Sequence, residues 1–123
     1  MSKKILIIDD DLYIRELYEE LLRDEGYDVT AAVDGQEGLQ KISGGGFDLV
    51  LLDVMMPKID GVGILTKLTE TPPKIKNGPI ILLTNLANDP VIDQAKALGA
   101  KDFFIKSDHT PDEFLEKIKG YLK

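Results

Sequence analysis

Acidic, hydroxyl and basic side chains directly follow short apolar runs at several points along this chain. These residues are Asp9, Asp10 and Asp11 after one run, Asp53 after a second, Thr84 after a third and Lys106 after a fourth. In open α/β sheets, ligands bind beyond the carboxyl ends of the parallel strands. If the runs are such strands, we expect carboxylates, a hydroxyl group and an ammonium group to converge on one rim.

Carboxylates at such a rim predict a cation site. Carboxylates within a few ångströms repel each other, so one must take up a proton or a cation must join them. Oxygen ligands at a partly open site suit Mg²⁺, which keeps several waters and favours carboxylates together with phosphate oxygens. A carboxylate beside that cation can act as a nucleophile and form an acyl phosphate. Lys106 would then neutralise charge on the phosphoryl oxygens, and Thr84 would donate a hydrogen bond to them.

Some polar residues near these runs have simpler structural explanations. An aspartate after a strand is commonly a helix N-cap, and we assign that role to Asp11. His109, the single histidine, comes just before a predicted capping box, and we expect it to be solvated. No glycine-rich loop follows the first apolar run, so the rim does not resemble a nucleotide phosphate cradle. Gly44-Gly45-Gly46 instead predicts the end of a helix at the opposite rim.

The elements that must position these groups follow from hydrophobic patterning. Apolar runs without alternation are typical of strands buried on both faces of a parallel sheet. The predicted strands cover residues 5–8, 28–32, 49–52, 80–83 and 102–105. Helical patterns separate them, and a capping box at Thr110 and Glu113 opens the last helix. Five strands alternating with five helices predict a doubly wound α/β sheet, with residues 71–78 as a candidate flexible insert.

The composition narrows the possible partners and locations. The chain has 123 residues, a net charge of −7 and no cysteine, which fits one domain without disulfides or thiolate metal sites. A surface of this charge repels phosphate backbones, so we expect no binding to nucleic acid. No apolar run approaches the length of a membrane span or a signal-peptide core, so we expect no membrane association and a cytoplasmic location.

Four segments then resemble those of response regulator receiver domains, in that family's order and spacing. They are residues 7–11, 52–61, 82–84 and 103–106, and the Asp-x-x-Met-Pro-x-x-Asp-Gly stretch within residues 53–61 is the most specific. The resemblance covers essentially the whole chain. It implies a flavodoxin-like, five-stranded parallel sheet in the order 2-1-3-4-5 with five helices. It also implies that residues 1–123 form a single receiver domain without an output domain.

The resemblance gives roles to the acidic residues of the rim. Asp53 would be the phosphoacceptor of a two-component signalling system. Asp9 and Asp10 would hold Mg²⁺ together with Asp53, and the backbone carbonyl of Met55 would complete the protein ligands. Such a domain is not a conventional enzyme, because it only phosphorylates itself in a Mg²⁺-dependent reaction and slowly dephosphorylates itself.

The resemblance also implies roles for residues around the phosphoryl group. Thr84 and Lys106 would contact it, and Phe103 falls at the position of an aromatic switch coupled to the threonine. The chain departs from the family at two neighbouring positions. Asn85 stands where a small residue is usual, and Ser107 stands where proline is usual, for which we expect a trans Lys106–Ser107 peptide bond.

The implied partners are a histidine kinase or phosphotransfer protein and a downstream target protein. The target would bind the face formed by the fourth helix, fifth strand and fifth helix. Two alternatives remain open from the sequence. One is a phosphatase of the haloacid dehalogenase type, with Asp9 as nucleophile and Asp11 as general acid. The other is an interaction module of receiver shape that binds partners without being phosphorylated.

Overall fold

The computed structural model describes residues 2–56, 58–85, 90–106 and 109–122. Within these residues, five strands alternate with five helices, as the sequence predicts. The strands are β1 (Lys4–Ile8), β2 (Asp28–Ala32), β3 (Leu49–Asp53), β4 (Ile80–Thr84) and β5 (Asp102–Ile105). The helices are α1 (Leu12–Asp24), α2 (Gly35–Gly44), α3 (Gly61–Glu70), α4 (Pro90–Ala97) and α5 (Pro111–Tyr121).

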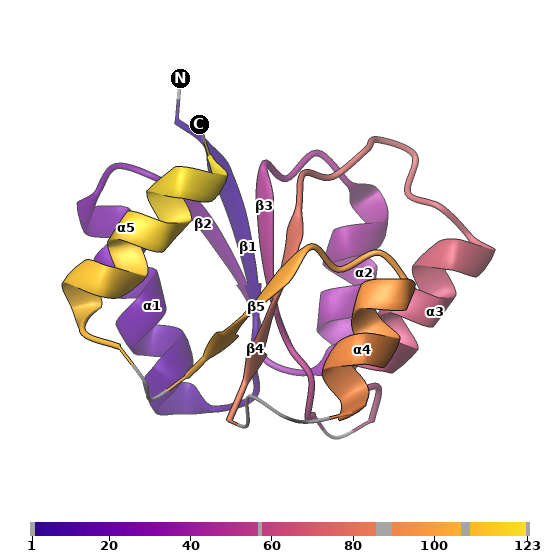
Figure 1. Cartoon of the computed structure of the whole chain (residues 1–123). Helices are drawn as coiled ribbons and strands as arrows, with labels where there is room; N and C mark the ends of the chain where they lie inside the picture. Colours follow the sequence, from indigo (N-terminus) through magenta and orange to yellow (C-terminus); the bar gives the residue numbers. More distant parts are fainter. Residues whose placement is uncertain (1, 57, 86–89, 107–108, 123) are drawn as a thin grey trace.

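The strands form one parallel sheet in the order β2-β1-β3-β4-β5. Figure 1 shows α1 and α5 on one face of the sheet and α2, α3 and α4 on the other. The strand order reverses after β1, which lies between β2 and β3. The predicted doubly wound fold and its strand order are therefore confirmed, and the carboxyl ends of all the strands point to the same rim.

Burial on both faces explains the unbroken apolar runs. Every residue of β3 is buried, and in β1 the residues from Ile5 to Ile8 are completely shielded from solvent. Ile5 and Ile7 pack in the core beneath α1 and α5, whereas Leu6 and Ile8 pack beneath α2, α3 and α4. Because successive side chains point to opposite faces, a strand between two helix layers needs an apolar residue at every position.

Polar caps fix where the helices begin. Asp11 Oδ1 accepts hydrogen bonds from the backbone N–H groups of Tyr13 and Ile14, at 3.0 and 3.2 Å, so the predicted N-cap role is confirmed. Thr110 and Glu113 form the predicted capping box of α5. At the other end of a helix, Gly45 has φ 73° and caps α2, as the glycine triplet indicates.

The loop between α3 and β4 is anchored, although its sequence suggests a flexible insert. The Asn77 side chain donates to the carbonyl of Ile42 at 3.0 Å and accepts from the N–H of Phe47 at 3.1 Å. The next residue, Gly78, donates to the Phe47 carbonyl at 2.7 Å. These bonds hold the loop against the end of α2. Across the described ranges, no helix combines the length and the apolar character that crossing a membrane requires.

Candidate functional site

The predicted rim residues come together at the carboxyl ends of the central strands. Asp9 directly follows β1, Asp53 ends β3, Thr84 ends β4, and Lys106 directly follows β5. The register aligns Asp53 with Leu83 of β4, and Thr84 with Ile105 of β5. Asp9 is 0% exposed, Asp53 3% and Thr84 2%. These three polar residues are therefore buried, although they lie at the rim of the sheet.

Lys106 bridges the two buried carboxylates. Its Nζ lies 2.9 Å from Asp9 Oδ2 and 3.1 Å from Asp53 Oδ2, and its side chain is 7% exposed. The backbone of Lys106 is also held, because its N–H donates to the Thr84 carbonyl and its carbonyl accepts from the Tyr18 hydroxyl at 3.2 Å. Lys106 is therefore a fixed cation between two acids, not the solvated lysine that usually follows a strand.

The remaining carboxylate oxygens accept backbone hydrogen bonds. Asp9 Oδ1 accepts from the N–H of Asp11 at 2.9 Å, and Asp53 Oδ1 accepts from the N–H of Met55 at 3.1 Å. Each bond spans two residues and turns the chain sharply as it leaves its strand. The two carboxylates are thus oriented by the loops that follow them.

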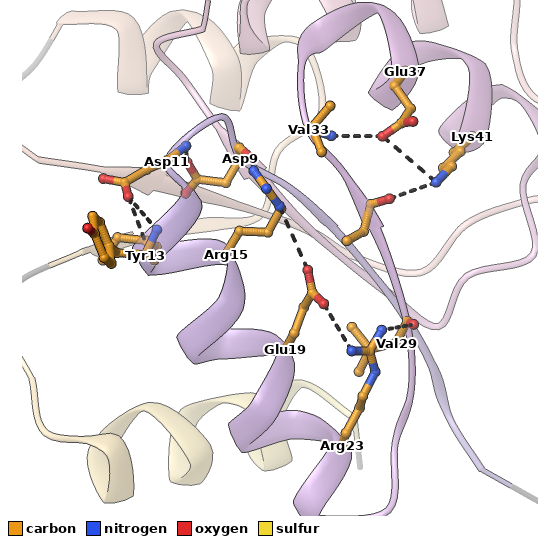
Figure 2. Close-up of polar contacts among 12 residues, drawn as sticks. Asp9, Asp11, Tyr13, Arg15, Glu19, Arg23, Val29, Val33, Glu37 and Lys41 are labelled. Atoms are coloured by element: carbon orange, nitrogen blue, oxygen red, sulfur yellow. Dashed lines mark hydrogen bonds and ion pairs between the residues drawn. The ribbon is translucent and has the colours of Figure 1, made fainter.

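A chain of polar contacts ties the backbone of Asp9 to α1 and β2, as Figure 2 shows. Arg15 Nη1 donates to the Asp9 carbonyl at 2.9 Å, and the Arg15 guanidinium lies 3.8 Å from Glu19. Glu19 also pairs with Arg23 at 3.0 Å, and Arg23 donates to the Val29 carbonyl at 3.2 Å. Sequence reasoning missed Arg15. The charges at spacing four predict the helical pairs, but no local pattern indicates the contact with Asp9.

The acids could hold a divalent cation. Carboxylate oxygens of Asp9, Asp10 and Asp53 lie within 4.8 Å of one another. Asp9 and Asp53 are buried, whereas Asp10 is exposed and lines an open cleft of about 500 Å³ together with Asp53 and Met55. Among the described residues, the ion pairs of this cluster set one ammonium group, that of Lys106, against three carboxylates, which leaves a local excess of negative charge. An oxygen donor set that opens to water fits Mg²⁺.

Burial and charge perturb the ionisation of this cluster. Burial, reinforced by the nearby Asp9 carboxylate, raises the pKa of Asp53 to about 7, although Lys106 acts in the opposite direction. Burial alone would lower the pKa of Lys106, but its hydrogen bonds to Asp9 and Asp53 and their charges outweigh that effect and raise it. Lys106 therefore stays charged, whereas Asp53 is poised to change its protonation near neutral pH.

Close packing explains the glycine at the start of α3. A Cβ on Gly61 would lie 2.8 Å from the Asp53 carbonyl oxygen, so α3 can begin this close to β3 only with glycine there. Asp60 caps α3 through the N–H of Gly63 at 2.8 Å. Lys58, at φ 70°, pairs through its Nζ with Asp34 Oδ2 at 3.2 Å. That pair joins this loop to the start of α2, a contact that sequence reasoning missed.

The structure places the other predicted residues around this cluster. Thr84 and Asn85 line the cleft, as does Met55, a residue that is 65% exposed. Phe103 is half-buried on the side of α4, with Lys96 Nζ 5.3 Å from its ring centre. The roles of Met55 and Phe103 stay predictions. Ser107, and with it the expected trans peptide bond, lies outside the described residues.

The prediction of a solvated His109 holds only in part, because this residue is half-buried. Its ring meets Phe104 edge-on, with ring centres 4.8 Å apart, and its Nε2 is buried without a hydrogen-bond partner among the described residues. A tertiary contact explains this burial, because the segment before α5 brings His109 back over the aromatic core beside β5. His109 is not among the residues that line the cleft at the carboxylate cluster.

The contacts of Asp11 bear on the rival phosphatase assignment. That reading requires Asp11 as a general acid, a group that must present a proton to a leaving oxygen. Asp11 Oδ1 instead accepts from two backbone N–H groups at the start of α1. This contact is the helix-capping role that the sequence predicts for Asp11, and it turns one carboxylate oxygen toward the start of α1. The described contacts of Asp11 therefore give no support to the general-acid role that the phosphatase alternative assigns to it.

Known proteins resemble this chain along nearly its whole length. The family described as the response regulator receiver domain matches residues 5–119. The chemotaxis protein CheY of Treponema pallidum is 33% identical over 123 residues, covering 98% of this chain and 83% of that protein. The probable transcriptional regulator ycf27 of Porphyridium aerugineum is 39% identical, covering 99% of this chain but 49% of ycf27. The chain thus spans about half the length of several curated relatives.

Solved structures share the fold over the same span. The chemotaxis response regulator CheY4 of Vibrio cholerae superposes with a TM-score of 0.86 at 30% identity, covering 99% of this chain and 100% of CheY4. The response regulator TrrA of Thermotoga maritima, solved in complex with Mg²⁺ and BeF, gives a TM-score of 0.80 at 36% identity. That match covers 98% of this chain and 100% of TrrA.

Proposed function

This chain belongs to the response regulator receiver domain family, and on that premise we propose that it accepts a phosphoryl group on Asp53. Receiver domains are signalling domains rather than conventional enzymes. The proposed output is a phosphorylation-dependent contact with another protein in the cytoplasm, and not nucleic-acid binding, given the net charge of −7. The observation that carries the proposal is the position of Asp53, which lines an open cleft while Lys106 holds its carboxylate.

The proposed transfer is a displacement at phosphorus. A carboxylate oxygen of Asp53 forms the new P–O bond while the P–N bond of a donor phosphohistidine breaks. The electron pair of that bond stays on the donor nitrogen, which leaves as neutral imidazole because the other ring nitrogen is already protonated. Charge is spread over the phosphoryl oxygens during the transfer, so positioning and electrostatic stabilisation supply most of the catalysis.

Lys106 and Thr84 would stabilise that charge. Lys106 Nζ is 3.1 Å from Asp53 Oδ2 and can pair with the phosphoryl oxygens once Asp53 has lost its own negative charge. Thr84 lines the same cleft at the end of β4 and would donate its hydroxyl hydrogen to a phosphoryl oxygen. Both residues line the same cleft as Asp53, which lowers the cost of reorganisation during transfer.

Mg²⁺ is the proposed cofactor. Asp9, Asp10 and Asp53 would hold it with the backbone carbonyl of Met55. When bound, the ion supplies positive charge that lets an anionic phosphoryl group approach three carboxylates. The local excess of negative charge supports this assignment. So does the solved complex of TrrA with Mg²⁺ and BeF, at 36% identity to this chain.

The proposed donor is a histidine kinase or a phosphotransfer protein. The proposed output surface is the face of α4, β5 and α5, where Phe103 would act as the switch. β5 pairs with β4, and Phe103 lies opposite Leu82, two residues before Thr84. A movement of Thr84 toward a phosphoryl group would therefore be transmitted through neighbouring residues of β4 to the ring of Phe103.

Intact-mass measurement tests the proposal. The protein incubated with acetyl phosphate and MgCl₂ should gain the mass of one phosphoryl group, and the Asp53→Asn variant should gain none. A receiver-shaped module that works without phosphorylation predicts no gain in either protein. An unchanged gain in Asp53→Asn would move the phosphoacceptor to another residue.

A further inference from the structure

A second cavity, open to solvent, lies at the opposite end of the sheet from the carboxylate cluster. Its volume is about 540 Å³, and it opens between the loop after α3 and the turn that leads into β5. Figure 1 shows this loop, which connects α3 to β4, at the end of the sheet where β4 begins. Ile80 starts β4 beside the cavity, whereas Thr84 ends the same strand at the carboxylates. The two sites therefore share no lining residue.

One wall of this cavity is preformed. Asn77 bonds both to the end of α2 and to Phe47, which holds the loop from behind. A Cβ on Gly78 would overlap the Asp48 carbonyl oxygen, and one on Gly45 would overlap the Ile75 carbonyl oxygen, so the loop backbone packs tightly on that side. On its other side the loop faces the cavity. A binding site whose wall is already ordered costs little conformational entropy to occupy.

The interior of the cavity is mainly apolar, and its charged groups are lysines. Leu68, Pro79 and Ile80 supply apolar surface, and Lys76 and Lys101 lie at the edge. Among the described residues that line it there is no aspartate or glutamate, although the whole chain carries 22 acidic residues against 15 basic ones. Cavities of a few hundred cubic ångströms with apolar walls and a few polar groups are typical of small-molecule sites.

The two lysines have no competing acidic partner. Neither Lys76 nor Lys101 forms an ion pair with any residue in the described part of the chain, whereas Lys41, Lys58, Lys106 and Lys119 each do. Both lysines are exposed. The backbone N–H of Lys101 donates to the Ile80 carbonyl at 2.8 Å, which holds Lys101 at the edge of the cavity. Their charges are therefore available to an anion from solution.

We propose that this cavity binds a small organic anion. The compact apolar body of the anion lies against Leu68 and Ile80. The carboxylate or phosphate group of the anion pairs with Lys76 and Lys101. The charge of the ligand is set by the lysines, and its size by the cavity of about 540 Å³. This site is independent of phosphorylation at Asp53, so its test does not depend on the proposed function.

Nuclear magnetic resonance with a matched pair of probes tests the proposal. 2-Naphthoate carries an aromatic body and a carboxylate, and 2-naphthamide has the same body without the charge. Titration with 2-naphthoate should shift the backbone amide signals of Gly78 and Gly99 saturably and leave that of Thr84 in place. The neutral amide should bind more weakly by about two- to fivefold per lysine contact, the range expected for exposed ion pairs.

Charge variants locate the anion within the cavity. Lys76→Gln and Lys101→Gln should each weaken 2-naphthoate binding by about two- to fivefold. Lys74→Gln is the matched control, because Lys74 is an exposed lysine of the same loop that does not line the cavity. It should leave the affinity unchanged. Equal losses in all three variants would mean that the effect is general electrostatics, which would overturn the proposed site.

Other outcomes would also overturn it. Equal affinities for 2-naphthoate and 2-naphthamide would remove the role of the lysines, and saturable shifts confined to other residues would remove the cavity. If only an acidic peptide with a leucine anchor shifts Gly78 and Gly99, the cavity is a docking site for a protein partner instead. If these two signals shift with protein concentration alone, it is covered by a second copy of the chain.

Discussion

Lys106 Nζ lies 3.1 Å from Asp53 Oδ2, so the proposed phosphoacceptor is already paired with a cation before any phosphoryl group arrives. This pairing is shared, because the same nitrogen lies 2.9 Å from Asp9 Oδ2. One ammonium group thus serves two buried acids, while Asp10 adds a third carboxylate at the surface of the cluster. The consequences for stability, metal binding and phosphoryl transfer can each be measured.

Protonation of Asp53 should make the stability of the metal-free protein depend on pH. The pKa of Asp53 is about 7 in the folded protein, against an ordinary value of 3.8. The folded state therefore takes up a proton at a higher pH than the unfolded chain does. The contribution of this group is fully present below about pH 4 and is lost as the pH rises to about 7.

The Asp53→Asn variant should reveal that dependence in chemical denaturation. At pH 8 without metal it should be more stable than the parent protein by about 2–4 kcal/mol, and the difference should disappear near pH 4. Asp28→Asn, which changes an exposed aspartate at the start of β2, is the control and should give no such profile. A difference that does not vary with pH would contradict the raised pKa of Asp53.

Removing the ammonium group of Lys106 should lower the free energy of unfolding most where Asp53 is ionised. Lys106→Met leaves Asp9 and Asp53 buried without their cation, and losing one partner of a buried ion pair costs about 3–5 kcal/mol. The loss should be largest at pH 8 and smaller at pH 5, because Asp53 then holds a proton. Denaturation of Lys106→Met at both pH values checks this, and adding Asp53→Asn should restore much of the stability. No restoration would mean that the loss comes from packing alone.

Mg²⁺ should stabilise the protein through Asp10 and not through Asp11. Ligands that bind only the folded state raise its stability with concentration, so MgCl₂ should raise the Tm. Asp10→Ala should abolish the rise. Asp11→Ala should keep it, while lowering the Tm at every MgCl₂ concentration because losing an N-cap costs about 1 kcal/mol. Loss of the MgCl₂ response in both variants would refute the separate roles of the two residues.

The position of Met55 predicts a long-lived phosphoryl group. Hydrolysis needs a water molecule placed in line with phosphorus, and the Met55 side chain lines the cleft without a group that could hold it. Met55→Asn supplies an amide that can orient water, so the phosphorylated protein should decay several-fold faster. The decay of the phosphoprotein, followed by mass after removal of the donor, measures this. If Met55→Ala decays as fast as Met55→Asn, the faster decay comes from loss of the methionine side chain that shields the phosphoryl group, and not from an oriented water molecule.

The strands and the rim could be predicted because their signals are local. The unbroken apolar runs predicted both β1 and β3, and the residues directly after them had to reach one rim once the strands were parallel. The N-cap role of Asp11 could also be predicted, since its partners are two and three residues away. The family resemblance, not the patterning, supplied the strand order.

Features that depend on distant contacts could not be predicted in this way. The ring of His109 packs edge-on against Phe104, which no neighbouring residue indicates. The segment around Asn77 has the composition of a flexible loop, yet its side chain bonds to Ile42, 35 positions away. The contact of Arg15 with the backbone of Asp9 likewise depends on how α1 leaves the sheet. Such contacts follow from the packed fold rather than from periodicity.

The identity of the labelled aspartate tests the central claim most directly. After reaction with acetyl phosphate and MgCl₂, borohydride reduces an acyl phosphate to an alcohol, and peptide mapping then locates the changed residue. Asp53 should carry the change in the parent protein, and Lys106→Ala should slow the labelling without moving it. Label on Asp9, with rapid turnover that persists in Asp53→Asn, would contradict the account and support the phosphatase assignment.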